Sequence, residues 1–230
     1  MKLSNQTIEI LQYCAKLNEG LVLRPGQLIR TITKNKALFA EFQVEEQFPV
    51  ECALILKPFL HNLDSDTNVS FDHQEYILLS KSRTKTKVPR LDPKMVTAPP
   101  NKSLKVDQFE EKAFLHVDDL EEMPLGNLNS TFVFYAEVAG APIGLDICQN
   151  DVVRTLELKI PRKANQAFRA TIKGKNLVLP DGSYEVEFSR KGVSRWRGLN
   201  VAATIFVAIE SRASSFVEKP NEPTQNVGTA

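Results

Sequence analysis

The chain opens on a polar stripe at helical spacing. Ser4 suits the N-cap position of a helix. Polar side chains then recur three or four positions apart, at Asn5, Glu9, Gln12, Lys16 and Glu19. Apolar residues fill most positions between them, and Gly20 ends the pattern. We therefore expect an amphipathic helix with one face in the core and one polar face outside.

After Gly20 the pattern changes to short strands separated by turns. Segments of apolar and β-branched residues alternate with Pro, Gly and Asn turns. In the first half the expected strands are 21–24, 27–33, 37–43, 50–56, 68–72, 75–80 and 82–88. A short helix at 57–63, with Pro58 near its first position, interrupts them.

A segment rich in Pro and Lys at 89–105 indicates an extended connector between domains. Beyond it the order of the first half returns. Expected strands lie at 112–117, 131–138, 142–148, 152–160, 167–172, 182–190, 195–199 and 202–211, with short helices at 118–123 and 173–179. The repeated order indicates an internal duplication. We predict an α+β chain with domains at 1–105 and 106–217 and a mobile tail at 218–230.

Composition adds little to this picture and excludes several classes of protein. Of 230 residues, 42% are hydrophobic and 25% charged, as in ordinary globular domains. The net charge of +1 gives no bulk attraction to nucleic acid, so DNA contact would need local charge segregation. No apolar run reaches the roughly 20 residues that span a bilayer, and the start lacks a signal-peptide core. We expect a cytosolic protein that has no membrane partner.

Candidate chemistry is sparse. Cys14, Cys52 and Cys148 are odd in number and far apart, and each has apolar neighbours, which predicts buried free thiols. The three histidines lack metal-ligand spacing, and the chain has no phosphate-binding loop motif. The carboxylates between Asp118 and Glu122 have no nucleophile or histidine partner. We expect no metal, no cofactor and no catalytic site.

Several segments resemble the DNA polymerase sliding clamps of T-even bacteriophages. They are MKLS at 1–4, GLVLRPGQLI at 20–29, DPKMVTAPPNK at 92–102, LPDGSYE at 179–185 and FVAIE at 206–210. Between 106 and 169 only the order of elements matches, together with the hairpin expected from strands 131–138 and 142–148. The resemblance implies two clamp-like domains per subunit and three subunits closed into a ring, with antiparallel sheets outside and short helices lining a pore.

The resemblance also implies a function. Such a clamp is a non-enzymatic processivity factor that encircles duplex DNA without sequence specificity and tethers the replicative polymerase through the polymerase's C-terminal peptide. A separate ATP-dependent clamp loader opens the ring, in the cytoplasm of the infected bacterial host. The same composition would also suit a second class, a two-domain β-rich phage structural or assembly protein that does not encircle DNA.

Basic and polar residues on the expected pore helices are the candidates for facing DNA: Lys2, Gln12, Lys16, Lys57, His61, Lys173 and Lys175. Spacing alone favours a solvated face for the first helix, and the resemblance favours a face that lines the pore. A second basic set would share one face of a strand, where it either protects a sheet edge or contacts a polyanion or a subunit. Its members are Lys81, Arg83, Lys85 and Lys87.

Two further expectations concern partners. Asp118, Asp119, Glu121 and Glu122 would repel DNA, so either these side chains point elsewhere, toward a neighbour's basic strand, or other helices carry the positive lining. The resemblance places the polymerase peptide in an apolar pocket near the connector. Aromatic and apolar residues of that neighbourhood serve either the pocket or the core: Val106, Phe109, Phe114, Phe206 and Phe216.

Overall fold

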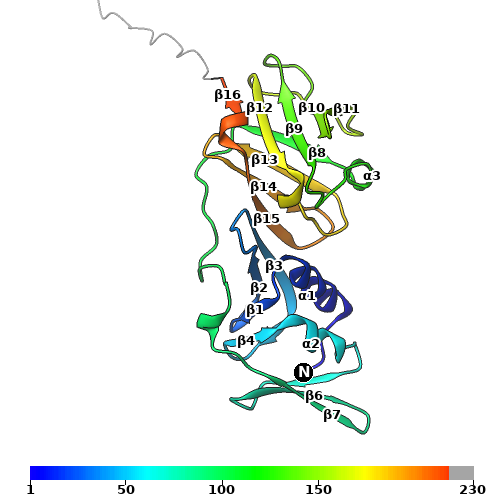
Figure 1. Ribbon diagram of the computed structural model, residues 1–230, viewed down its shortest axis with the longest axis vertical. Helices are drawn as coiled ribbons and strands as arrows, with labels where there is room; N and C mark the ends of the chain where they lie inside the picture. Colours follow the sequence, from blue (N-terminus) through cyan, green and yellow to red (C-terminus); the bar gives the residue numbers. More distant parts are fainter. Residues whose placement is uncertain (218–230) are drawn as a thin grey trace, which may run out of the picture.

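The computed structural model describes residues 1–217, arranged as two halves along the long axis (Figure 1). The predicted mobile tail at 218–230 lies outside the described residues. The first half consists of α1 (Asn5–Leu17), β1 (Gly20–Leu23), β2 (Gly26–Ile32), β3 (Leu38–Phe48), β4 (Cys52–Ile55), α2 (Leu56–His61), β5 (Asn68–Ser70), β6 (Tyr76–Lys81) and β7 (Thr84–Pro89).

A connector with one 3₁₀ turn, η1 (Pro93–Met95), leads into the second half. Its elements are β8 (Glu111–Leu115), α3 (Val117–Glu121), β9 (Ser130–Ala136), β10 (Gly144–Gln149), β11 (Val152–Leu156), β12 (Phe168–Lys173), η2 (Gly174–Asn176), β13 (Tyr184–Ser189), β14 (Val193–Gly198), β15 (Ala203–Ala208), η3 (Ser211–Ala213) and β16 (Ser215–Phe216). The expected mixture of many strands and few short helices is confirmed.

Several element limits differ from the prediction, and β3 and η2 are two examples. β3 continues to Phe48, because Val44 and Phe48 bury side chains beyond the predicted end at residue 43. The helix expected at 173–179 is a single 3₁₀ turn, since Gly174 and Asn176 are weak helix formers. The carbonyls of Gly174 and Leu177 instead both accept from the Gly126 backbone N–H.

The two halves repeat one pattern of antiparallel pairing. β1 pairs with β4 as β9 pairs with β12, and β2 pairs with β3 as β10 pairs with β11. The meander β5-β6-β7 matches β13-β14-β15. In this scheme α3 corresponds to α1, and η2 corresponds to α2. The sequence-level duplication is therefore visible in the strand ladders.

Within residues 1–217, one strand pair joins the halves. β3 and β15 are antiparallel, with Leu38, Ala40 and Phe42 opposite Val207, Ile205 and Ala203. The resulting sheet, β2-β3-β15-β14-β13-β8, belongs to both halves, so the domain limits 1–105 and 106–217 stay a prediction. The strands that correspond to β3 and β15 in the other half are β11 and β7. Each of these two ends its sheet.

The cysteines lie only partly as predicted. All three are free, and Cys14 and Cys52 are buried. Burial raises the pKa of the Cys14 thiol far above its usual value. Cys148 was also expected to be buried, but this expectation is wrong, because its side chain is half-buried on β10 across from Thr131 and Val153.

The start of α1 is held by a contact that the sequence pattern did not indicate. Ser4 caps the helix as predicted, its hydroxyl accepting from the Thr7 N–H. The Glu46 carboxylate, from β3, accepts from the Ser4 N–H and from the Thr7 hydroxyl. Burial alone would raise the pKa of Glu46, but these hydrogen bonds outweigh it and hold that pKa below its usual value.

Replacing Glu46 with glutamine is expected to lower the free energy of unfolding by about 1 kcal/mol at pH 7, because it removes a charge-assisted helix cap. The lowered pKa means that the ionised carboxylate stabilises the fold above its unfolded-state pKa of about 4.3 and ceases to do so as pH falls through the folded value. Urea unfolding should show wild type and Glu46→Gln converging below about pH 4. The exposed neighbour Glu45, changed to Gln, is the control; equal losses for both variants would contradict the cap.

Candidate nucleic-acid interface

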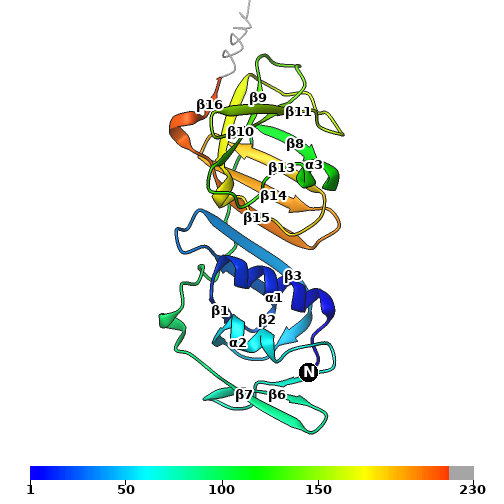
Figure 2. The same cartoon turned by 45° about the vertical axis from the view of Figure 1, so that its right-hand side comes forward.

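The two helices of the first half, α1 and α2, lie side by side on one face of the molecule (Figures 1 and 2). The buried side of α1 carries Ile10, Leu11 and Cys14, while Gln12 and Lys16 are exposed. On α2, Leu56 and Phe59 are buried and Lys57 and His61 are exposed. The structure thus brings four of the predicted DNA-facing residues onto one surface.

The η2 turn of the second half continues this surface. The Tyr13 hydroxyl of α1 donates to the backbone carbonyl of Val178 (2.7 Å), and the Asn35 side-chain amide donates to the side-chain oxygen Oδ1 of Asn176 (3.1 Å). Lys175 is exposed there. A cleft of about 400 Å³ separates α1 from the turn after η2, and Gln12 and Lys16 line it.

Two other predicted DNA-facing lysines have acidic partners. Lys2 pairs with Asp66 (3.7 Å), and Lys173 pairs with Glu210 (3.0 Å). Both lysines and Asp66 are about half or more exposed, and Glu210 is about one third exposed, so each ion pair contributes little to stability. The local positive field is nevertheless smaller there than the sequence suggested, because each ammonium has a carboxylate beside it.

The acidic run around α3 is mostly occupied by contacts within the chain. The buried Asp119 accepts from the backbone N–H groups of His116 (2.7 Å) and Lys159 (3.0 Å), so it caps the helix. Asp118 lies within 3.4 Å of His116 and 3.8 Å of Lys159. Glu122 pairs with Arg154 at 2.9 Å. These carboxylates bind their own fold, which removes much of the expected conflict with DNA.

The predicted basic strand is divided by a turn, so the expectation that its four charges share one face of a strand is wrong. Lys81 ends β6 and pairs with Asp64, and hydrogen bonding to this lysine lowers the Asp64 pKa to about 2. Ser82, with φ of 51°, and Arg83 form the turn. Only Lys85 and Lys87 follow on β7, where Lys87 lies 4.6 Å from the centre of the Tyr76 ring.

The aromatic candidates for the peptide pocket do not converge on one place. Phe206, on β15, is buried and stacks on Phe39 of β3 with ring centres 5.9 Å apart. Phe216 lies in the other sheet, because β16 pairs with β12, and there it stacks on Phe168. The other three candidates are half-buried. Phe109 lies under the guanidinium of Arg195, Phe114 lies on β8, and Val106 lies in the connector.

An apolar cavity does lie at the connector, beside the Phe39–Phe206 pair. Its volume is about 340 Å³, and it is lined by Ile32, Phe39, Pro100 and Leu104, with a polar rim of Lys36, Lys102, Ser103 and Lys105. The connector is fixed over the sheet where Ser103 donates to Glu41 (2.8 Å), which also accepts from Arg30 (2.6 Å). Phe39 was not among the residues predicted from the sequence, because its contact with the connector joins residues that are distant in the chain.

Residues 1–217 contain no group of three or more His, Cys, Asp or Glu side chains placed to hold a metal ion. Over the same range, no helix has the length and apolar content needed to cross a membrane. The surface formed by α1, α2 and η2 carries the exposed Lys16, Lys57 and Lys175, and also the exposed carboxylate of Glu9.

No protein-family model matches the chain. Among curated proteins it is 27% identical over 222 residues to the sliding clamp of Vibrio phage KVP40, covering 92% of this chain and all of that protein. It is 28% identical over 127 residues to the sliding clamp of Enterobacteria phage T4, covering 54% of this chain and 55% of that one.

Solved structures show the same fold at low identity. The PCNA2–PCNA3 complex from Sulfolobus tokodaii matches with a TM-score of 0.62 at 14% identity, over 92% of this chain and all of that one. DNA polymerase III subunit beta from Borrelia burgdorferi matches with a TM-score of 0.66 at 11% identity, over 92% of this chain and 64% of that one.

The repeated α+β halves, their shared sheet and these structures define a protein with the DNA-clamp fold, and the predicted fold class is confirmed. In sequence, the chain is a homologue of the phage sliding clamps, as its resemblance to the T-even clamps predicted.

Proposed function

We propose that this chain is the sliding clamp of a phage replication system, a non-catalytic processivity factor that encircles duplex DNA and keeps the replicative polymerase on it. Tethering raises the effective concentration of the polymerase at the primer end, so synthesis continues without a new bimolecular encounter. The clamps of phages KVP40 and T4 support this assignment by homology.

The observation that carries the proposal is the strand pair between the halves. Within the chain, β3 of one repeat pairs with β15 of the other. Their counterparts β11 and β7 both end their sheets within the described residues. Unpaired strand edges are templates for another chain, and a head-to-tail contact that closes on itself gives a ring. Repeating the internal joint between copies therefore pairs β7 of one chain with β11 of the next.

Three copies would close the ring, as the resemblance to the T-even clamps implies. The continuous sheet would then lie outside, and α1, α2 and η2 would face the pore. The exposed groups on that face would contact DNA phosphates and not base edges, as sliding over any sequence requires. The chief candidates are Gln12, Lys16 and Lys175.

The connector cavity is our candidate site for the C-terminal peptide of the polymerase. Its apolar floor would take apolar or aromatic side chains, and the rim lysines Lys36, Lys102 and Lys105 favour a peptide that also carries acidic residues. An ATP-dependent loader would open the ring, and the bacterial cytoplasm during infection is where such a clamp would act.

Light scattering over a dilution series tests the assembly. We expect a mass of three times the 25.8 kDa chain at high concentration, falling toward the single chain on dilution. A synthetic peptide with the C-terminal sequence of the cognate polymerase should bind the assembled protein. A monomer or dimer at every concentration, with no peptide binding, would favour the structural or assembly protein over the clamp.

A further inference from the structure

The connector crosses the shared sheet at Ser103 with a hollow on each side of it. One hollow is the connector cavity, where Ser103 forms part of the wall. The other has a volume of about 390 Å³, and Ser103 lines it together with residues of β2, β3, β14 and β15, among them Leu28, Gln43, Arg197 and Thr204. Ser103 itself is exposed. Packing therefore does little to hold the connector at this point, and its position depends on polar contacts.

Two side chains of the sheet supply those contacts. Arg30 of β2 and Glu41 of β3 lie opposite each other in the strand ladder, and Arg30 Nε donates to Glu41 Oε1 at 2.6 Å. The same carboxylate oxygen accepts from the Ser103 hydroxyl at 2.8 Å. The other guanidinium nitrogens of Arg30 donate to Asn101 Oδ1 (3.3 Å) and to Ser103 Oγ (3.4 Å). Because paired strands hold both Arg30 and Glu41, these contacts fix where Ser103 lies.

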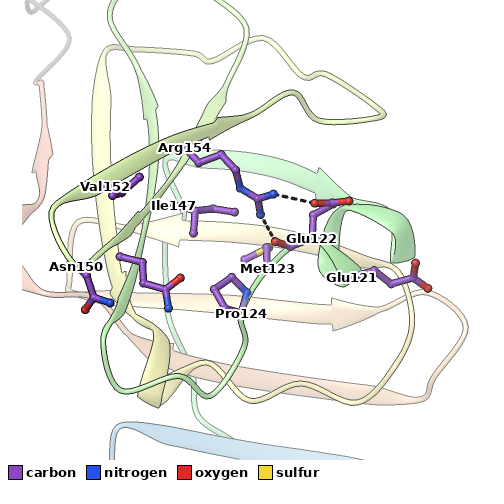
Figure 3. Close-up of a pocket in the computed structure, with 9 residues that line it drawn as sticks. Glu121, Glu122, Met123, Pro124, Ile147, Asn150, Val152 and Arg154 are labelled. Atoms are coloured by element: carbon purple, nitrogen blue, oxygen red, sulfur yellow. Dashed lines mark hydrogen bonds and ion pairs between the residues drawn. The ribbon is translucent and has the colours of Figure 1, made fainter.

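Burial distinguishes the Arg30–Glu41 pair from the solvent-exposed ion pairs of the chain. For comparison, the Arg154–Glu122 pair lies in the open cleft between α3 and the β10–β11 hairpin, and both of its side chains are about half exposed (Figure 3). Solvent screens such a pair, so it constrains its surroundings little. Arg30 and Glu41 are only 13% and 11% exposed. A pair so poorly solvated needs its hydrogen-bond partners, and Ser103 is one of them.

Leu104 follows directly on Ser103 and depends on it for its place in the cavity wall. In the part of the chain that the structure describes, residues 104–106 make no hydrogen bond. The next contacts of the connector lie on the second half, where Asp107 pairs with Lys191 (2.8 Å) and Phe109 lies under Arg195. Ser103 is therefore the last point fixed on the first half before the connector contributes Leu104 to the cavity.

We propose that Arg30, Glu41 and Ser103 form a latch that holds the connector on the sheet and places Leu104 in the wall of the peptide site. Arg30 and Glu41 are then positioning residues, which act on the peptide through the connector. The inference deepens the proposed function, because it rests on the connector cavity as the site for the polymerase's C-terminal peptide. An open latch removes part of the cavity wall, so the apparent dissociation constant rises as the latched fraction of molecules falls.

Removing the Ser103 hydroxyl tests the latch. Ser103→Ala is expected to raise the dissociation constant of the labelled polymerase peptide about fivefold, the factor that one hydrogen bond of typical net strength contributes to an equilibrium. Glu41→Ala should weaken binding at least as much, whereas Ser103→Thr, which keeps the hydroxyl, should stay within about twofold of wild type. Glu185→Ala is the matched control, because Glu185 pairs with Arg197 and Lys112 on the same face of the shared sheet.

Two further measurements show whether the effect passes through the connector. In the peptide-free protein, trypsin should cut after the exposed Lys102 and Lys105 about fivefold faster in Ser103→Ala and Glu41→Ala than in wild type or Glu185→Ala, since cleavage follows the population of opened connector. In a Leu104→Ala background, Ser103→Ala should change peptide affinity by less than about twofold, because the side chain that the latch positions is already gone.

The outcomes separate the latch from the peptide site. Wild-type peptide affinity in Ser103→Ala and Glu41→Ala overturns the latch and leaves the connector cavity as the site. A loss of affinity without faster cleavage, or an equal loss in the wild-type and Leu104→Ala backgrounds, also overturns it, since Ser103 would then act independently of the connector's position. A wild-type protein that binds no peptide overturns the proposed site and with it the positioning role, even where trypsin shows that the connector is latched.

Discussion

Replacing Val153 with lysine is expected to dissociate the assembled protein into single chains at concentrations at least ten times higher than for wild type. Val153 is 60% exposed on β11, the strand that would receive β7 of the next copy. β7 carries Lys85 and Lys87. A lysine introduced at Val153 would meet these like charges at an edge where strands must approach to about 5 Å.

The matched control is Val138→Lys. Val138 is 62% exposed in the turn region between β9 and β10, away from the terminal strand. Light scattering should show wild-type assembly for Val138→Lys and a larger monomer fraction for Val153→Lys. The thermal unfolding of the monomer should be unchanged in both variants. Wild-type assembly of Val153→Lys would contradict the strand pairing on which the ring depends.

Replacing Leu104 with aspartate is expected to weaken binding of the polymerase's C-terminal peptide at least tenfold without affecting assembly. Leu104 lines the connector cavity and remains 46% exposed, so it is available to a ligand and contributes little to the core. A carboxylate in this apolar lining would lose solvation when the peptide covers it. Fluorescence anisotropy of the labelled peptide measures the effect.

Met95→Asp is the control for the connector cavity. Met95 lies in η1 of the same connector and is 76% exposed, but it does not line the cavity. Its change should leave peptide affinity within about twofold of wild type. Equal affinity for Leu104→Asp and wild type would place the peptide site elsewhere and overturn the assignment of this cavity.

Local pattern predicted much of the fold for a physical reason. α1 follows from a polar stripe at helical spacing and a Ser4 cap, both of which depend on residues close in sequence. The strands follow from short apolar segments between turn residues. The basic strand was mispredicted because its alternation continues through Ser82 and Arg83, where the chain turns instead.

Contacts between distant residues could not be predicted in this way. Glu46 caps α1 from 42 positions away, and Asp119 binds the backbone at Lys159, yet neither carboxylate differs in local pattern from a solvated one. The same holds for the connector cavity, where Phe39 lies beside residues 100–105, which are distant from it in the chain. The resemblance to phage clamps supplied the class of site, and the folded chain shows which of the predicted residues lie on one exposed surface.

Retention on circular DNA tests the central claim most directly. The protein would be loaded with its clamp loader and ATP onto a nicked circular plasmid, separated from free protein by gel filtration, and then treated with a restriction enzyme that cuts the plasmid once. A ring that encircles DNA should stay with the circle and leave after linearisation, since its hold is topological. Equal retention on circular and linear DNA, or none on either, would contradict an encircling clamp.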